Sequence, residues 1–374
     1  MKILVAPDSF GGTLSAVEAA EAVAAGWRRY APDDEILVRP LSDGGPGFVD
    51  VLASVLSGRL LPVTVPDPFG RQVPARVFRV GDTAFVESAQ ATGLHLLDPA
   101  ERDPLRATSY GVGVMITAAV ETGARRVVVG LGGSATNDAG AGMLAALGVA
   151  PLDAGGAALP YGGAALVALD RLEGTPRLRG VELVAASDVD NPLVGQHGAS
   201  AVFGPQKGAG VDDVALLDVA LARWAQVTER DLPGVPAGLA LLAGGGAAGG
   251  LGAALLALGA RRESGIELVR QAVGLDAAVD NADLVLTGEG SFDAQSLRGK
   301  VAAGVARAAA HHGRPCLVLA GQVSVDESEL VASGVRAAYS VAEHAGSVQA
   351  AMAAPAERLA DLAARVASDW GHRR

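Results

Sequence analysis

The sequence predicts an α/β protein with two domains: a Rossmann-like parallel-sheet domain built from both chain ends, and a second α/β domain inserted into it. Both ends alternate short apolar runs with amphipathic stretches, the order typical of strands and helices in a parallel sheet. From about Pro66 the chain is broken by Pro and Gly. A length of 374 residues also suits two domains. We expect residues 1–66 and 282–374 in the first domain and residues 67–281 in the second.

At the N-terminal end, the order strand, loop, helix occurs twice. The expected elements are a strand over residues 2–6, a helix over 15–29, a strand over 35–39 and a helix over 49–56. Ser15 and Glu18 have the spacing of a capping box, which supports the start of the first helix. Loops that follow parallel strands meet at one sheet edge, where ligands bind in open α/β folds, so we expect Asp8, Ser9 and Asp43 there.

The remaining elements are predicted from the same apolar patterns. In the inserted domain they are antiparallel strands over residues 73–78 and 84–87, a helix over 109–121, strands over 125–129 and 181–185, and a helix over 212–229. Residues 152–176 are rich in Gly and Pro and are expected to be irregular. In the last segment they are strands over 283–287, 316–320 and 336–340, and helices over 301–312 and 348–368.

The motif that organises the chain is GLGGSATNDAGAGML, residues 130–144, which follows a β-branched strand. Gly132 and Gly133 permit backbone angles that other residues avoid and let a ligand approach closely. The helix-capping residue types in the loop are Ser134, Thr136 and Asn137. We therefore expect free N–H groups of the next helix beside the loop, where an anion such as phosphate binds, and Asp138 could hold a metal ion. The alternative is a connection whose polar residues only cap the helix.

Pairs of acidic residues follow two other predicted strands. Asp188 and Asp190 stand two residues apart, so an extended backbone points both carboxylates to one side. Glu289 and Asp293 lie in a Gly-rich turn. Phosphoryl transfer needs carboxylates for Mg²⁺ and one more to orient or deprotonate the attacking hydroxyl. The alternatives are an Asx turn ahead of Pro192 for the first pair and a helix cap for the second.

Lysine occurs only at positions 2, 207 and 300, although the chain holds 30 Lys plus Arg residues. Lys207 lies between turn residues, and Lys300 begins a predicted helix, where a cation opposes the helix dipole unless it helps to bind an anion. The alternative for each is an ordinary solvated lysine.

Composition argues against several classes of partner. A net charge of −11 disfavours a general nucleic-acid or anionic-membrane surface. One cysteine, Cys316, allows no intrachain disulfide. Residues 232–260 are uncharged and long enough to span a bilayer, but their nine glycines and two prolines favour a glycine loop and a short helix. Because no apolar signal core follows Met1, we expect a cytoplasmic protein.

A second glycine pattern suggests a different cofactor. Gly244, Gly246 and Gly249 match the GxGxxG fingerprint of dinucleotide-binding loops, with Glu267 eighteen residues later. The preceding LALLA is a poor strand candidate, and chance matches are common in such a glycine-rich run. This pattern is therefore the weaker of the two.

Taken together, the motifs resemble those of the type I glycerate kinase family. In order, they are APDSFGGTLSA, PLSDGG, TSYGVG, GLGGSATNDAGAGML, SDVDNPLVGQHGA, VFGPQKGA, GAAGGLGAAL and TGEGSFDAQSLRGK. The resemblance runs through nearly the whole chain. It implies ATP- and Mg²⁺-dependent phosphorylation of D-glycerate to 2-phosphoglycerate or 3-phosphoglycerate, in an active site between two α/β domains.

The resemblance places candidate residues around that cleft, and their roles are assigned on chemistry. Asp188 is expected to take the proton from the glycerate hydroxyl, with Lys207 as a second catalytic residue. The expected substrate-binding residues are Asp8, Ser9, Asp43, Arg71, Asp190 and Asn191. The expected nucleotide- and phosphate-binding residues are Gly132, Gly133, Ser134, Asn137, Glu289 and Lys300. The expected metal ligands are Asp138, Asp190 and Glu289.

The chain departs from the family pattern in three motifs. Gly11 stands where family members usually have a lysine. Pro46 and Phe48 stand where they usually have an acidic residue and a hydroxyl residue, and Ser291 stands where an arginine is common. If the missing lysine binds a substrate carboxylate or a phosphate, Arg71 or Lys207 is expected to replace it.

Three other functions remain open from the residues. They are a kinase of another small hydroxy acid, a dinucleotide-binding oxidoreductase and a non-catalytic sensor on a kinase scaffold. The partners expected are glycerate and ATP, with no nucleic acid and no membrane. The oligomeric state is left open, a homodimer included.

Overall fold

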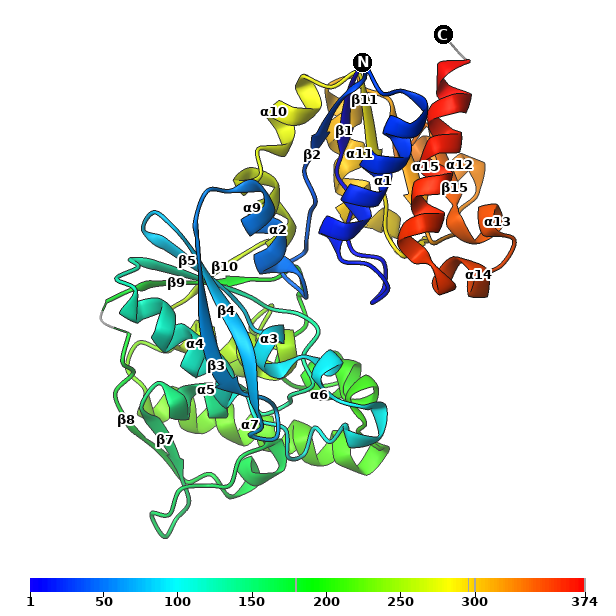
Figure 1. The fold of residues 1–374 in the computed structure, drawn as a ribbon. Helices are drawn as coiled ribbons and strands as arrows, with labels where there is room; N and C mark the ends of the chain where they lie inside the picture. The colour runs from blue at the N-terminus through cyan, green and yellow to red at the C-terminus, as the bar shows by residue number, and fades with distance from the viewer. Residues whose placement is uncertain (179, 295, 299–300, 373–374) are drawn as a thin grey trace. The chain divides into compact units, whose positions relative to one another are not determined.

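The structure, a computed structural model, describes residues 1–178, 180–294, 296–298 and 301–372 (Figure 1). It divides into two compact units. Unit 1 comprises Met1–Asp43, Asp50–Leu56 and Ile266–Arg374, and unit 2 comprises Gly44–Val49 and Ser57–Gly265. Each unit has helices packed around a sheet that contains parallel strands, so the α/β fold class is confirmed. No helix among the described residues is long and apolar enough to cross a membrane.

Unit 1 contains a five-stranded parallel sheet. Its strands are β1 (Lys2–Val5), β2 (Glu35–Val38), β11 (Leu284–Thr287), β13 (Cys316–Ala320) and β15 (Ala337–Ser340). They lie in the order β15-β13-β11-β1-β2, and every neighbouring pair is parallel. From β1, the sheet extends to β2 on one side and to β11, β13 and β15 on the other. The strand order therefore reverses between β1 and β11, where doubly wound sheets bind ligands.

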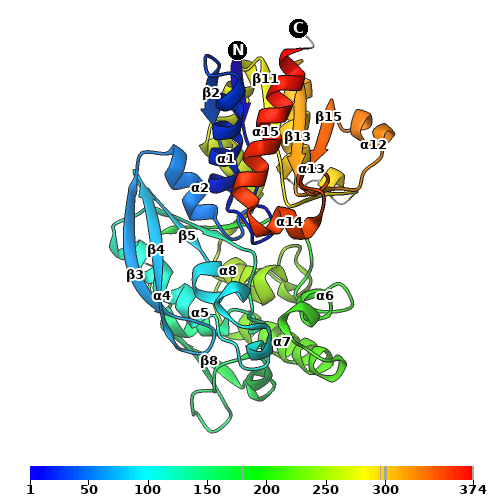
Figure 2. The same ribbon diagram turned by 45° about the vertical axis from the view of Figure 1, so that its right-hand side comes forward.

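Two long helices cover one face of this sheet. They are α1 (Ala16–Tyr30) and α15 (Pro355–Gly371), which lie side by side in both views (Figures 1 and 2). Ile3, Leu284 and Leu317 share one apolar core with them. The intervening strand residues point to the other face, where α11 (Val301–His311) contacts β11 and β13. The predicted capping box at Ser15 is present and begins α1.

The other elements of unit 1 are short. They are α9 (Gly265–Ala272), α10 (Leu275–Asp280), β12 (Ser291–Phe292), η7 (Ser296–Arg298), β14 (Gln322–Val323), α12 (Glu327–Ala332), α13 (Val341–Ala345) and α14 (Val348–Ala353). Helix α2 (Phe48–Val55) begins in the segment assigned to unit 2 and continues in unit 1.

Unit 2 contains a six-stranded mixed sheet in the order β10-β9-β6-β5-β4-β3. The strands are β3 (Arg59–Pro66), β4 (Gln72–Val80), β5 (Thr83–Glu87), β6 (Arg126–Gly130), β9 (Glu182–Ala186) and β10 (Arg261–Glu263). The β3–β4 and β4–β5 pairs are antiparallel, whereas β5, β6, β9 and β10 are parallel neighbours. The carboxyl ends of β6 and β9 therefore meet at one edge of the sheet.

Helices and short turns complete unit 2. The helices are α3 (Ala89–Thr92), α4 (Tyr110–Glu121), α5 (Ala141–Ala146), α6 (Ala199–Phe203), α7 (Val211–Asp231) and α8 (Leu251–Ala257). The 3₁₀ turns are η1 (Leu94–Leu96), η2 (Pro99–Glu101), η3 (Gly163–Ala168), η4 (Pro205–Lys207), η5 (Leu239–Leu241) and η6 (Ala247–Gly250). Strands β7 (Val149–Leu152) and β8 (Arg171–Gly174) form a separate antiparallel pair. Met115, Val129 and Trp224 belong to one continuous apolar core.

Several segments differ from the expectation. Residues 57–66 were expected in the first domain, but β3 pairs along its whole length with β4 and belongs to the second sheet. Residues 266–281 were expected in the second domain but belong to unit 1. Residues 152–176 are not irregular throughout, because β8 pairs with β7. In this last case strand pairing satisfies backbone N–H and C=O groups of a segment whose prolines and glycines had suggested irregular structure.

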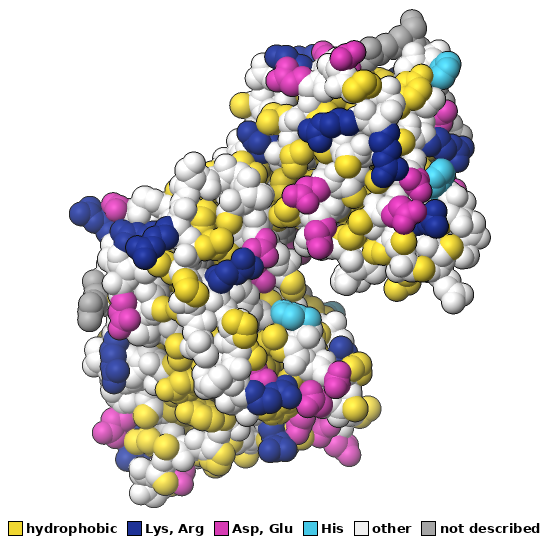
Figure 3. Space-filling view, viewed as in Figure 1, with side chains coloured by type: hydrophobic (Ala, Val, Ile, Leu, Met, Phe, Trp, Pro, Cys, Tyr) yellow, Lys and Arg dark blue, Asp and Glu magenta, His cyan; other side chains and the backbone are white. Residues whose placement is uncertain are grey.

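The face drawn in Figure 3 shows Lys and Arg side chains singly or in small groups, interspersed with Asp and Glu.

Close packing of α1 on α15 predicts an unusual response to a glycine substitution. A Cβ atom at Gly26 would lie 2.0 Å from the Ala360 carbonyl oxygen, so Gly26→Ala should cost about 1–3 kcal/mol of unfolding free energy. The matched control is Gly304→Ala in α11, where the nearest atom is 3.9 Å away. Without a steric clash, alanine should stabilise that helix by about 0.5–1 kcal/mol. Denaturant unfolding of both variants checks this, and equal effects would contradict the packing argument.

Candidate functional site

Three carboxylates gather at the carboxyl edge of the unit 1 sheet. Asp8 follows β1, Asp43 follows β2 and Glu289 follows β11. The Asp8 N–H donates to the Gly288 carbonyl at 2.8 Å, which joins the first and last of these loops. The pKa of Asp8 is raised from 3.8 to about 7, chiefly by burial and also by repulsion from Asp43 and Glu289, while hydrogen bonds from Ser9 act to lower it. The predicted placement of Asp8, Ser9 and Asp43 in loops at one sheet edge is therefore present, and Glu289 joins them.

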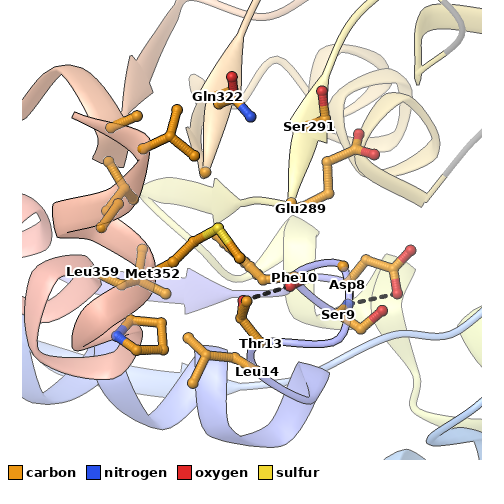
Figure 4. A pocket seen from close by; sticks show the side chains of 18 residues that line it. Asp8, Ser9, Phe10, Thr13, Leu14, Glu289, Ser291, Gln322, Met352 and Leu359 are labelled. Carbon is orange, nitrogen blue, oxygen red and sulfur yellow. Dashed lines mark hydrogen bonds between the residues drawn. The ribbon is translucent and has the colours of Figure 1, made fainter. Parts of the chain in front are cut away.

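A cavity of about 480 Å³ opens at this edge, entirely within unit 1 (Figure 4). Its polar side is lined by Asp8, Ser9, Glu289, Ser291 and Gln322. Its apolar side is lined by Phe10, Leu14, Val341, Val348, Met352 and Leu359. In Figure 4 the sulfur of Met352 points into the space between the two sides. The cavity thus combines hydrogen-bonding groups with a wide apolar wall.

The glycine loop of unit 2 is packed against another segment of the same unit. A Cβ atom at Gly132 would lie 2.7 Å from the Gly45 Cα, and one at Gly133 would lie 2.7 Å from the Pro46 Cγ. Gly133 also has φ +62, a backbone angle that favours glycine. The N–H groups of Gly132, Gly133 and Ser134 donate to no acceptor within the described residues. Packing therefore requires the glycines, while their amides have no acceptor among the described residues.

The helix after this loop begins later than the sequence predicted. Helix α5 starts at Ala141, and its N-cap is Gly140, so the interpretation of Ser134, Thr136 and Asn137 as capping residues is wrong. The donors at the helix start are taken by Asp138, which accepts hydrogen bonds from Gly140 N and Gly142 N. A free anion site at the start of α5 is therefore absent.

Asp138 is buried and surrounded by donors. Besides the two glycine amides, it accepts hydrogen bonds at 2.8 Å from both the backbone N–H and the hydroxyl of Ser109. Burial raises its pKa, and these hydrogen bonds act against the rise. The geometry favours a structural role for this carboxylate over the predicted one as a metal ligand.

Lys207 is also directed inward. Its ammonium donates to the Ser134 hydroxyl at 2.9 Å and to the Thr136 carbonyl at 2.6 Å, and the residue is only 2% exposed. Burial lowers the pKa of Lys207 to about 7, whereas the Asp138 charge acts to raise it. Lys207 therefore fixes the glycine loop from inside. The assignment of Lys207 as a residue that touches substrate stays a prediction.

Buried polar atoms in the same loop lack protein partners. Asn137 donates from its side-chain amide to the Ser200 hydroxyl at 2.9 Å. Its carbonyl oxygen and the Thr136 hydroxyl make no hydrogen bond with the described residues, although both side chains are fully buried. Such atoms are commonly satisfied by ordered water.

The acidic pair after β9, Asp188 and Asp190, is held by Arg262 in β10 and by Ser264 directly after β10. The Ser264 hydroxyl donates to Asp188, and the Arg262 guanidinium pairs with Asp190 at 2.5 Å. Asn191 donates to the His197 carbonyl at 2.8 Å. Asp188 and Asp190 are both exposed to solvent. Because Asp190 already has a cationic partner, binding a metal ion there would require Arg262 to move.

Arg71 is held by carboxylates of its own unit other than Asp188 and Asp190. Its guanidinium pairs with Asp67 at 2.6 Å and with Glu101 at 3.0 Å, and it lines a different hollow beside Arg102. Since two carboxylates hold Arg71 there, the geometry does not support it as a replacement for the missing family lysine. Lys300, predicted to bind phosphate, lies outside the described residues.

Sequence reasoning missed several residues that shape these loops. Ser264 and Arg262 gave no sequence signal, because their partners lie more than 70 positions away. Glu87, which is buried, accepts hydrogen bonds from Gly47 N and Val49 N at 3.1 Å and so holds the segment that packs on the glycine loop. An acid at the end of an apolar strand was the only signal for it.

Two further observations concern cofactors. Within the described residues, no three His, Cys, Asp or Glu side chains are grouped so that they could hold a metal ion. The second glycine pattern lacks the strand that a dinucleotide loop needs, because Leu239–Leu241 forms a 3₁₀ turn. A Cβ atom at Gly249 would lie 1.9 Å from the Thr136 carbonyl, so packing explains that glycine.

Comparison with known proteins gives consistent results. A family model described as the glycerate kinase family matches residues 3–371. Glycerate kinase from Bacillus subtilis (strain 168) is 42% identical over 374 residues, covering 98% of this chain and 97% of that protein. Glycerate 2-kinase from Escherichia coli (strain K12) is 42% identical over 361 residues, covering 94% and 93%. A crystal structure described as glycerate kinase 2 from Salmonella typhimurium LT2 has a TM-score of 0.82 at 41% identity, covering 100% of this chain and 98% of the other.

Because Asp138 is buried and hydrogen-bonded, we predict that replacing it lowers the stability of the fold rather than the affinity for a metal ion. Asp138→Asn replaces an acceptor by an amide NH₂ that opposes donors already present, and should lower the unfolding free energy by about 2–4 kcal/mol. Asp153→Asn in an exposed turn, where one oxygen accepts from Ala157 N, is the control and should change it by less than about 0.5 kcal/mol. Chemical denaturation measures both. Unchanged stability with weakened Mg²⁺ binding would instead support the metal-ligand role.

Proposed function

Because the chain belongs to the glycerate kinase family, a family of enzymes that are kinases, we propose that it transfers the γ-phosphoryl group of ATP to D-glycerate with Mg²⁺ as cofactor. The observation that carries this proposal is the match over residues 3–371, together with 42% identity to two proteins named for this activity. The name of the Escherichia coli relative, glycerate 2-kinase, supports transfer to the 2-hydroxyl and therefore 2-phosphoglycerate as the product.

Asp188 is the residue that we assign to the acceptor hydroxyl. Its carboxylate is exposed at the end of β9, and the Ser264 hydroxyl holds it in one orientation. A carboxylate fixed in this way can accept the hydroxyl proton while the oxygen attacks the phosphorus atom. Ser264 is then a positioning residue, because it acts through Asp188.

The polar side of the unit 1 cavity fits a magnesium ion that arrives with a nucleotide. Asp8 and Glu289 place two carboxylates on adjoining loops, where their mutual repulsion would be relieved by a divalent cation. Proteins commonly hold Mg²⁺ by one or two carboxylates plus substrate phosphates rather than by a complete protein cage. This mode of binding is compatible with the lack, among the described side chains, of a cluster of three potential metal ligands. The bound ion would neutralise part of the negative charge on the phosphates.

The amides of Gly132, Gly133 and Ser134 are proposed to bind phosphate oxygens. They donate to no acceptor within the described residues, and Gly133 is exposed. Successive free amides in a turn form a concave site for anions. Lys207 would hold the loop in this shape from below, through Ser134 and Thr136.

The proposed reaction is tested by phosphorus NMR of the purified protein with ATP, Mg²⁺ and D-glycerate. We expect ADP and a phosphomonoester signal coupled to the proton on carbon 2. A signal from carbon 3 would correct the position of transfer, and the absence of ADP would contradict the activity. Removal of Mg²⁺ with EDTA should abolish turnover, and added Mg²⁺ should restore it.

Asp188→Asn should lower kcat by about 10²–10⁴-fold, because the amide keeps the shape of the side chain but cannot accept the proton. The KM values for ATP and D-glycerate should change little. Asp212→Asn, at an exposed position in the first turn of α7, is the matched control and should keep wild-type kcat. A coupled ADP-release assay checks both variants, and melting temperatures should stay within about 2 °C of the parent. Wild-type turnover in Asp188→Asn would remove Asp188 from this role.

A further inference from the structure

We propose that the apolar side of the unit 1 cavity binds the adenine base and ribose of the nucleotide that donates the phosphoryl group. The inference rests on the proposed kinase function and adds a location for the nucleoside that no sequence motif indicated.

Size and charge exclude glycerate as the main occupant. A space of about 480 Å³ is in the range of sites for drug-sized ligands and far exceeds a three-carbon acid. Its lining contains no Lys, Arg or His among the described residues, whereas Asp8 and Glu289 stand on its polar side. A small carboxylate would meet repulsion from these two carboxylates there. An uncharged nucleoside avoids this cost.

The apolar wall suits a flat heteroaromatic ring. Phe10 and Leu14 contribute from the loop before α1, and Val348 and Met352 contribute from α14 (Figure 4). Val348 is 41% exposed and Met352 is 59% exposed, so apolar surface remains open to solvent at the mouth of a concave site. Burial of this surface against a base would be favourable, and the flexible methionine can adjust to the ring.

Polar groups around the wall match the remaining parts of a nucleoside. The Gln322 amide carries both a donor and an acceptor and extends toward the cavity from β14 (Figure 4). A glutamine amide is complementary to the donor and acceptor on the edge of adenine. The hydroxyls of Ser9 and Ser291 lie on the polar side and can bond to ribose hydroxyls. These groups point to adenine as the preferred base.

The position in the fold supports the same ligand. The cavity lies outside the carboxyl ends of β1 and β11, between which the strand order reverses. Open α/β sheets bind ligands at this point because the loops diverge to opposite faces and leave a crevice. The same loops bring Asp8 and Glu289, the proposed magnesium ligands, to the edge of the nucleoside site.

The first test is photolabelling of the intact protein with 8-azido-ATP, followed by mass spectrometry of peptides. We expect covalent label on residues 341–359 or 9–14, and suppression of that label by excess ATP. Label confined to peptides of unit 2, or label that ATP does not suppress, would overturn the inference. Absence of any nucleotide-dependent label would overturn it as well.

The second test uses the double variant Val348→Gln plus Met352→Gln, which makes the wall polar at two exposed positions. The Kd for ADP by calorimetry and the KM for ATP should each rise at least tenfold, with inhibition by inorganic triphosphate unchanged, because triphosphate has no base. The control is Val211→Gln plus Val219→Gln on α7, where both valines are exposed, at 89% and 63%. Unchanged ADP binding in the wall variant would contradict the proposal.

The two proposals fail separately. If D-glycerate receives no phosphate but ADP binding is lost in the wall variant, the nucleoside site stands and the acceptor is another molecule. If D-glycerate is phosphorylated and the wall variant keeps its ADP affinity and ATP KM, the kinase function stands and the base binds elsewhere.

Discussion

The loops of this protein depend on charged side chains that are buried and must find partners inside the fold. A buried charge without hydrogen bonds is costly, so each one selects the backbone conformation that satisfies it. Asp138 gathers the amides of Gly140 and Gly142 together with Ser109, and Lys207 engages Ser134 and Thr136 from the other side. The glycine loop therefore owes its shape to internal electrostatics, and its exposed amides follow from that shape.

This constraint explains the limits of sequence reasoning about the site. The strands of unit 1 and the edge that collects Asp8, Ser9 and Asp43 could be predicted, because apolar runs and parallel order determine where loops meet. Whether an acidic side chain faces solvent or the interior could not be predicted. Asp138 meets Ser109 across 29 positions and Lys207 meets Ser134 across 73, and local patterns carry no information about such pairs.

Glycine was the other source of ambiguity, since it permits both close packing and close approach of a ligand. At Gly132 and Gly249 the neighbouring backbone occupies the space that a side chain would need, and packing is sufficient to explain the residue. A GxGxxG match inside such a run therefore has little weight until a strand precedes it, and here a 3₁₀ turn does. At Gly133 the two uses coincide, because Pro46 packs on one side while the amide stays exposed.

Pro46 and Gly11 are both positions at which the chain departs from the family it belongs to, and their surroundings give the departures a consequence. Gly11 lines the unit 1 cavity with no cationic side chain, and Arg71 and Lys207 are engaged in unit 2. No described lining residue can therefore neutralise a phosphate in that cavity. If a nucleotide binds there as proposed, a metal ion held by Asp8 and Glu289 would reduce the repulsion between these two carboxylates and a triphosphate. At the proposed nucleotide site, Gly11 in place of the lysine expected from the family pattern would therefore leave more of this neutralisation to Mg²⁺.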